Sequence, residues 1–370
     1  MKARIKILFI AIFSVGFVFS TCLSEAADIL TFTKIGTHPS NRELSGEGAD
    51  SKEAQGIASD GIHWFYSNKT HVYRLKTDFR NRDKSYNAAS TKFGSAKCDH
   101  VGGIDYYDGE VYAALDGCSD NNARIVVFDT NLSFKRYAVI PTLNNSFPWV
   151  AVNPIDAGYF YTISPDGKKK ILAFPRNFVN EASLNVVKEV HFTDHPQDKL
   201  DYFWAQGGAF STNGLFFRTV DDAKDEDSKH TGIWVYELDY PIVNGSTAQR
   251  IGFINIKYDP DQWVPGLCWF DQCQRNFELE DIDVTTIKTG PTMGNIHIII
   301  LSNEADEDDV SVLHYTIGDY DADGVIDTLD NCLRIPNAVQ ADLDRNGLGL
   351  ACDGNEIGSI LIPSLNLPLL

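Results

Sequence analysis

The pattern that decides the fold is clearest in residues 102–128, which read GGIDYYDGEVYAALDGCSDNNARIVVF. A run of small residues at 102–104 is followed by two β-rich runs, at 111–115 and 124–128. Asp108 and Gly109 separate the first two runs, and such residues adopt the positive φ angles that tight hairpin turns need. This stretch therefore predicts three consecutive strands joined by hairpins.

Four more copies of this three-part pattern occur within residues 28–318, spaced by 47 to 73 residues. The first runs, rich in small or acidic residues, are 55–57, 150–152, 207–209 and 280–282. The second runs are 62–66, 159–163, 215–219 and 296–300, and the third runs are 71–75, 171–174, 233–236 and 310–314. A fourth strand is predicted around Tyr137, Val187 and Phe253, after the second, third and fourth copies.

Regular repeats of this length are typical of a β-propeller, in which four-stranded sheets surround a central axis. Small residues suit the first strands, because these strands crowd the axis. We expect an all-β chain with five blades, in which residues 29–34 supply the missing fourth strand of the last copy and so cover an open sheet edge. Six blades, with one hidden in the longest interval, and a two-sheet sandwich are the alternatives.

Residues 1–26 have the features of a signal peptide. Lys2, Arg4 and Lys6 precede an apolar run at 7–19, and Ser24-Glu25-Ala26 gives the small-x-small pattern of a cleavage site. Cys22 raises the alternative of a lipoprotein, although the residues before it match a lipobox poorly. No later stretch is long and apolar enough to span a bilayer. We therefore expect an exported, secreted or extracellular protein without an integral membrane segment, with the periplasm or cell surface as alternatives.

Composition narrows the choice of partners. Hydrophobic residues make up 43% of the chain, which excludes wholesale disorder, and the net charge is −19. Phosphate binding needs a basic face, so the sequence predicts no nucleic-acid partner. Multivalent cations suit such an acidic surface.

Six cysteines remain after the signal peptide, as expected for an oxidising compartment. Pairing of nearest neighbours in sequence gives Cys98–Cys118, Cys268–Cys273 and Cys332–Cys352, although other pairings stay open. No CxxC pair occurs, so zinc and thioredoxin-like sites have no support.

Residues 319–330, DYDADGVIDTLD, have the layout of a twelve-position calcium loop. Calcium is a hard cation that takes six to eight oxygen ligands, and Gly324 at the sixth position permits the sharp turn. The expected ligands of this first loop are the side chains of Asp319, Asp321, Asp323, Asp327 and Asp330 and the carbonyl of Val325.

A second loop follows at residues 342–353, DLDRNGLGLACD. Its expected ligands are the side chains of Asp342, Asp344, Asn346 and Asp353 and the carbonyl of Leu348. Because it offers fewer anionic ligands, we expect the second loop to bind calcium more weakly than the first.

Residues 319–353 as a whole resemble the thrombospondin type 3 repeat. The DxDxDG opening, Asp330-Asn331-Cys332, Pro336-Asn337, Gln340 and the closing DxDxNGxGxxCD carry the resemblance. It implies a module that has almost no hydrophobic core and folds around calcium, with Asn331 as a further side-chain ligand. Leu333 and Ala338 replace the usual prolines, and Leu350 replaces a usual aspartate.

A solvated acidic linker is the alternative for this segment, but a linker does not need a glycine at the sixth position of both loops. Without metal we expect the module to be unfolded, since ion binding must supply what a core would. Residues 354–370 form an apolar tail that is too short to span a membrane.

Catalytic motifs are absent from the propeller region of the sequence. Ligands of propellers bind at the channel mouth, where the loops before the first strands meet those joining second and third strands. The residues expected there are Glu53, Gln55, His100, Trp149, Gln206, Glu278 and Glu280. His63, His297 and His314, like Trp149 and Trp204, are expected to be packing or surface residues.

Three hypotheses concern this mouth. The favoured one is a non-catalytic surface for an extracellular protein or glycan. The second is a pair of carboxylates acting as acid and base on a glycosidic bond. The third is a bound calcium ion that positions a phosphate or sugar, by resemblance in architecture to five-bladed calcium-dependent nucleotidases and six-bladed phytases. A calcium-dependent hydrolase using Glu53, Glu278 or Glu280 is therefore the alternative function.

Overall fold

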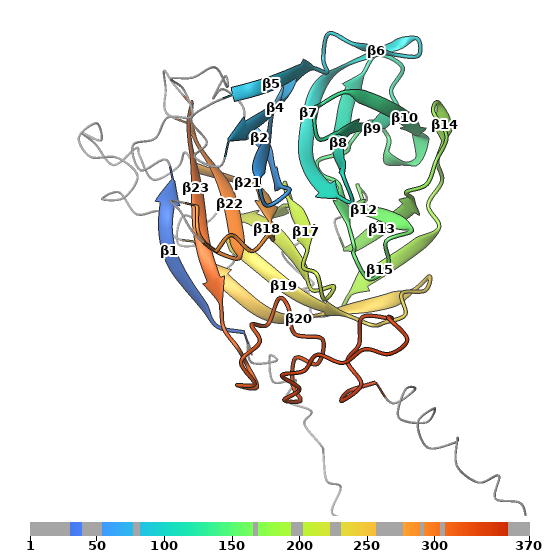
Figure 1. Ribbon diagram of the computed structural model, residues 1–370. Coiled ribbons are helices and arrows are strands. Elements are labelled where there is room, and N and C mark those ends of the chain that lie inside the picture. Colours follow the sequence, from blue (N-terminus) through green and yellow to red (C-terminus); the bar gives the residue numbers. More distant parts are fainter. Residues whose placement is uncertain are drawn as a thin grey trace, which may run out of the picture.

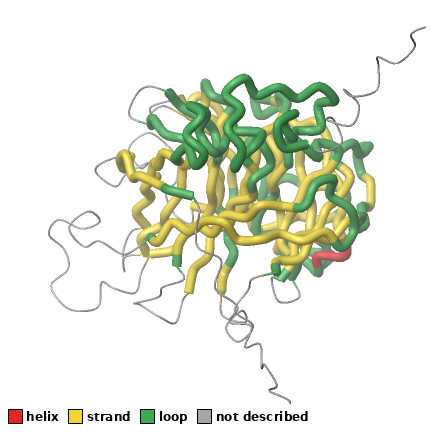
Figure 2. The backbone as a smooth tube through the Cα atoms, turned by 90° about the horizontal axis from the view of Figure 1, so that it is seen from below, coloured by secondary structure: helices red, strands yellow, loops and turns green. Residues whose placement is uncertain are grey.

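The structure is a computed structural model that describes residues 30–38, 54–76, 82–165, 169–193, 203–222, 231–256, 277–288, 292–303 and 308–353. These residues form β-strands and loops, and the helical structure among them is one short 3₁₀ turn, Pro141–Leu143 (Figure 2). The signal peptide (1–26) and the apolar tail (354–370) lie outside the described residues. Among the described residues no helix is long and apolar enough to cross a membrane.

The strands form five consecutive antiparallel sets. The first set is β2 (Ala54–Ser59), β3 (His63–Asn68), β4 (His71–Lys76) and β5 (Arg82–Asn87). The second is β7 (Ala96–Tyr107), β8 (Glu110–Cys118), β9 (Ala123–Asp129) and β10 (Phe134–Ile140). The third is β11 (Ala151–Val152), β12 (Tyr159–Ile163), β13 (Lys170–Pro175) and β15 (Lys188–Phe192). The fourth is β17 (Gly208–Phe210), β18 (Phe216–Asp222), β19 (Gly232–Leu238) and β20 (Ser246–Asn255). The fifth is β21 (Phe277–Asp283), β22 (Ile296–Asn303) and β23 (Asp308–Ile317), to which β1 (Phe32–His38) is added.

Three strands of two residues each extend these sets. β6 (Lys92–Phe93) pairs with β7, β14 (Ala182–Ser183) pairs with β10, and β16 (Phe203–Trp204) pairs with β18. Parallel pairing of the outer strands β15 and β20 joins the third and fourth sets into one hydrogen-bonded sheet.

The sets are arranged around a common axis as in a β-propeller (Figure 1). Their first strands contact one another in the cyclic order β2, β7, β11, β17, β21 and back to β2. The all-β, propeller-like expectation is thereby confirmed. Each predicted first, second and third run overlaps a strand of the set to which it was assigned.

Small residues in the first strands allow this close approach. A Cβ atom added to Gly102 would lie 2.4 Å from the carbonyl oxygen of Pro148, and one added to Gly208 would lie 2.9 Å from the ring of Trp149. Such distances are too short for any side chain other than hydrogen. The predicted role of small residues at the axis is therefore confirmed at these positions.

The start of the chain completes the last sheet, as predicted. β1 pairs antiparallel with β23, from Phe32 opposite Ile317 to His38 opposite Val312, which places it a few residues later than the predicted 29–34. β1 covers the edge of β23 that would otherwise be open, a protection that sheets need against edge-to-edge association.

Two predicted disulfides are present. Cys98 and Cys118 lie opposite each other on β7 and β8, and Cys332 is bonded to Cys352. Cys268 and Cys273 lie outside the described residues, so that pairing stays a prediction. The two described disulfides agree with an oxidising compartment.

Candidate metal centre

The C-terminal module, residues 319–353, consists of turns and bends and contains no strand in its described chain. It lies outside the sheets, next to β19 and β20, where it is drawn in orange and red in Figure 1. Its contacts include the turns that join first to second strands, namely Thr212 and Asn213 between β17 and β18 and Ile155 between β11 and β12. The module therefore occupies the face opposite to the loops that lead into the first strands.

Backbone amides shape the first loop by binding its aspartates. Gly324 N donates to Asp319 Oδ2 at 2.8 Å, and Val325 N donates to Asp323 Oδ1 at 2.8 Å. Asp323 N in turn donates to Asp321 Oδ1 at 3.3 Å. Gly324 has a φ of 94°, a conformation that glycine adopts without steric cost. These bonds curl the chain so that alternate side chains turn inward.

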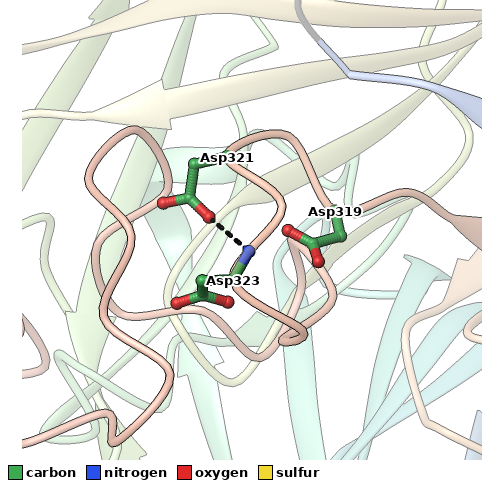
Figure 3. Close-up of side chains that lie close together, drawn as sticks. All are labelled: Asp319, Asp321 and Asp323. Atoms are coloured by element: carbon green, nitrogen blue, oxygen red, sulfur yellow. Dashed lines mark hydrogen bonds between the residues drawn. The ribbon is translucent and has the colours of Figure 1, made fainter.

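Three carboxyl groups converge inside this turn. Asp319, Asp321 and Asp323 each have one oxygen within 4.8 Å of the others, so the cluster can hold a metal ion (Figure 3). Within the described chain, Asp319 Oδ1 and Asp321 Oδ2 are buried atoms without a hydrogen-bond partner. A buried carboxylate oxygen without a partner costs free energy, which a cation between these oxygens would remove.

Asp327 is a fourth acidic residue of the same loop. It is 1% exposed; its Oδ1 accepts a hydrogen bond from Tyr320 N at 2.7 Å, and its Oδ2 has no partner among the described residues. Burial, followed by repulsion from Asp319 and Asp330, raises the pKa of Asp327 to about 6. Burial and the nearby Asp330 also raise the pKa of Asp321. The residues present therefore fit an oxygen-liganded cation.

Asp330 Oδ1 and the amide groups of Asn331 have protein partners. Asp330 Oδ1 accepts from Cys332 N at 2.8 Å and from Gln340 Nε2 at 2.9 Å. The Asn331 amide group donates to the carbonyl of Gln340 at 3.1 Å, and its backbone N donates to Gln340 Oε1 at 2.6 Å. Together with the Cys332–Cys352 disulfide, these contacts tie the first loop to the segment that leads into the second.

The second loop repeats the backbone geometry of the first. Gly347 N donates to Asp342 Oδ2 at 3.0 Å and Leu348 N donates to Asn346 Oδ1 at 2.8 Å, matching the bonds of Gly324 and Val325. Asp353 is 2% exposed and accepts from Asn346 Nδ2 at 2.8 Å. In the part of the chain that the structure describes, the second loop lacks a cluster of three converging carboxylates like that of the first.

Carboxyl groups near the axis form a second group. Of these residues, only Glu280 was predicted from the sequence to lie at the channel mouth. Asp281 Oδ2 accepts from Ile57 N and Ile104 N, both at 3.2 Å, and so binds β21 to β2 and β7. Asp283 Oδ1 accepts from Ser59 N at 3.2 Å, and Asp105 Oδ2 accepts from Val152 N at 2.6 Å. Each of these aspartates thus bonds one first strand to a neighbouring one. The sequence feature that could have indicated these bonds is an aspartate directly after the isoleucine that ends a first run, as at Asp105 and Asp283.

Burial controls the ionisation of these axial carboxyl groups. It raises the pKa of Asp105 to about 7 and, aided by repulsion from Asp105, the pKa of Asp283 to about 8. Burial likewise raises the pKa of Asp281 well above its usual value. At neutral pH these groups serve as structural acceptors between strands, and Asp281 and Asp283 lie out of reach of solvent.

The predicted mouth residues are found in different environments. Glu280 is 1% exposed, Trp149 is fully buried and donates to the carbonyl of Ala205 at 3.1 Å, and Glu278 is half-buried. His100 contacts Asp116 Oδ1 at 2.7 Å through Nδ1 and Gln55 Oε1 at 3.0 Å through Nε2. Glu53 lies outside the described residues. The described mouth residues therefore show no pair of solvent-facing carboxylates suited to acid and base roles.

The expected packing histidines are confirmed as such. His297 and His314 are buried, with 2.7 Å between their Nδ1 atoms, and burial lowers the pKa of His297 to about 4. His63 lies at the surface side of its strand and contacts Asp60 at 3.0 Å.

Comparison with known proteins gives no family. No family model matches the chain, and no curated protein matches it. Several solved structures resemble it in part. A gluconolactonase from Xanthomonas campestris has a TM-score of 0.41 and 10% identity, covering 80% of this chain and 93% of that one. Hsv2 of Kluyveromyces lactis has a TM-score of 0.33 and 13% identity over 72% of this chain and 73% of that one.

A protein of unknown function from Bacteroides caccae has a TM-score of 0.36 and 11% identity over 55% of this chain. The match spans 61% of that protein, which is less than two thirds of its length. At these TM-scores and identities the likenesses carry no conclusion about activity or ligand.

Proposed function

We propose that this chain is an extracellular calcium-binding protein in which a five-bladed propeller binds a protein or glycan ligand and a thrombospondin type 3-like module binds calcium. The single observation that carries the calcium assignment is the convergence of Asp319, Asp321 and Asp323, with buried oxygens that lack partners in the described chain. We favour a binding role over catalysis for the propeller because its sequence contains no catalytic motif.

Calcium suits this centre better than zinc or copper. All side-chain candidates offer oxygen, whereas zinc and copper sites use imidazole or thiolate ligands. The nearby cysteines are engaged in the Cys332–Cys352 disulfide. The first ion would be held by the side chains of Asp319, Asp321, Asp323, Asp327 and Asp330 and the carbonyl of Val325. The second would be held by Asp342, Asp344, Asn346, Asp353 and the carbonyl of Leu348, with Asn331 between the loops.

The cyclic contacts of the first strands support a count of five blades. Each set contributes one first strand to the cycle, and β1 completes the last sheet. The parallel contact between β15 and β20 joins two sets at their outer edges without adding a sixth first strand.

Calorimetric titration of calcium into the full chain, after treatment with a chelator, tests the proposal. We expect one tighter site and one weaker site in the natural chain, and loss of the tighter site in the double variant D319N/D321N. Asp108→Asn, an exposed turn residue on the propeller, is the matched control for removal of a charge. An unchanged titration in D319N/D321N, or no binding by the natural chain, would refute the assignment.

A further inference from the structure

The first loop of the module rests on a turn that belongs to the propeller. The Asn213 amide group donates one hydrogen bond to the carbonyl of Asp327 at 2.7 Å and another to the carbonyl of Asp330 at 2.6 Å. Thr212 Oγ1 donates to the carbonyl of Thr328 at 3.0 Å. Two residues of the β17–β18 turn thus bind three backbone carbonyls of the segment 327–330.

This turn is itself firmly held. The Tyr240 hydroxyl donates to the carbonyl of Gly214 at 2.7 Å and accepts from the Asn153 amide at 2.7 Å. Gly214 has a φ of 82°, and a Cβ atom there would lie 2.2 Å from the Tyr240 hydroxyl. Ser211 Oγ also bonds to Asn213 Oδ1, which directs the amide nitrogen toward the module. Asn213 is therefore positioned before the module contacts it.

The two carbonyls that Asn213 binds belong to Asp327 and Asp330, which are both expected calcium ligands. Asp327 Oδ1 also accepts a hydrogen bond at 2.7 Å from the backbone N of Tyr320, which lies between Asp319 and Asp321 in the sequence. These bonds add to those that Asp330 receives from Cys332 N and Gln340 Nε2 within the module. Asn213 of the propeller therefore helps to hold the backbone of Asp327 and Asp330 in place.

Apolar packing connects the same segment to the sheets. Leu333 is 7% exposed and belongs to the core cluster that includes Ile254 and Ile317, and Ile326 packs against that cluster. Gly318 N also donates to the carbonyl of Thr31 at 2.9 Å, next to β1. Ordering of the first loop therefore adds contacts to the sheets of the fourth and fifth sets.

We propose that Asn213 is a positioning residue for the calcium centre, and that calcium occupancy is coupled through it to the stability of the propeller. This inference rests on the proposed function, because it requires that the first loop binds calcium. In this proposal, the turn between β17 and β18 contributes to calcium affinity. The calcium-bound module in turn stabilises the face of the propeller that is formed by the turns between first and second strands. A module that served as an independent spacer would bind calcium without help from residue 213.

The experiment measures calcium affinity by calorimetry, and thermal unfolding with calcium or with a chelator, on the full-length mature chain. For Asn213→Ala we expect the tighter site to weaken about tenfold or more, since two hydrogen bonds to the loop are lost. We also expect a smaller calcium-induced rise in melting temperature and an unchanged melting temperature in chelator. A purely structural role would instead lower the melting temperature in chelator and leave affinity intact.

Two further variants keep the test decisive. Thr212→Val removes only the bond to Thr328 at an exposed position, so it should fold even if Asn213→Ala does not, and should weaken binding by a few-fold. Arg334→Ala removes a contact of the module with Glu237, 2.8 Å long, without touching the first loop, and should leave affinity unchanged. Natural affinity in both turn variants would overturn this inference alone. Absence of binding by the natural chain would overturn the proposed function as well.

Discussion

Leu333 is a single residue that attaches the C-terminal module to the sheets. The thrombospondin type 3 resemblance implies proline at this position and a module almost without a core. Leu333 is instead buried against isoleucines of the fourth and fifth strand sets. The substitution gives the module an apolar attachment to the propeller.

Truncating this side chain should therefore weaken the attachment. We expect Leu333→Ala to lower the free energy of unfolding by about 2–3 kcal/mol in calcium, in the range for a buried leucine. Leu343→Ala is the matched control, because Leu343 belongs to the same module and is 65% exposed. Chemical denaturation of both variants checks the difference; equal stability of the two would contradict the packing role.

The axial aspartates predict a dependence of stability on pH. The pKa of Asp283 is about 8 in the folded chain, so this carboxyl group stays protonated there while the unfolded chain ionises above about pH 4. Stability contributed by the protonated group is therefore present at low pH and is lost as pH rises from about 4 to 8. The pKa of Asp105, raised to about 7, contributes in the same direction.

Asp283→Asn should reduce this dependence. Because the amide does not ionise, we expect the variant to lose less stability than the natural chain between pH 5 and pH 8, by on the order of a few kcal/mol. Denaturant unfolding at both pH values measures it. Asp108→Asn, which changes an exposed turn residue, should follow the natural pH profile; a parallel profile for Asp283→Asn would rule out the effect.

At the scale of elements, the strands differ in how well the sequence indicates them. The first strands were predictable because crowding at the axis demands small residues such as Gly102 and Gly208. β5 was not predicted, since its polar sequence Arg82–Asn87 is largely exposed and lacks the alternation of a half-buried strand. Its position is determined by pairing with β4, an interaction that a local pattern does not reveal.

The two aspartate-rich loops could be predicted from the sequence because the spacing of acidic residues and the glycine positions are local features. Their attachment to the turn at Asn213 was not, because 114 residues separate Asn213 from Asp327. The axial bonds of Asp105 and Asp281 were missed for the same reason. Contacts across the axis depend on which first strands become neighbours. The repeat pattern predicts the strands within each set, but it does not predict the side-chain contacts between sets.

β1 gives a prediction at this scale. A mature chain that starts at residue 39 lacks β1 and exposes the edge of β23, so we expect a lower melting temperature and self-association. A chain that starts at residue 30 retains β1 and is the control. Size-exclusion chromatography and thermal unfolding of the pair provide the measurement; monodisperse behaviour with an unchanged melting temperature in the shorter chain would argue against closure by β1.

For the whole molecule, calcium should decide whether the module is folded. Arg334 and Arg345 are exposed sites for trypsin within the segment that we propose to be ordered by calcium. We expect rapid cleavage after both arginines in chelator and protection in calcium, while the sheets resist in both conditions. Mass spectrometry after reduction of Cys332–Cys352 identifies the fragments, and equal cleavage with and without calcium would show that the metal does not order the module.

The closure of the last sheet also has a mechanical consequence. Phe32 at the start of β1 lies opposite Ile317 at the end of β23, and the calcium module begins two residues later. Tension applied through the two ends of the folded part would therefore act at one end of this strand pair and separate it one residue at a time, like a zipper. Strand pairs loaded in this way yield at lower force than pairs that must slide past each other. The hydrogen bond from Gly318 N to the carbonyl of Thr31 lies where such opening would begin.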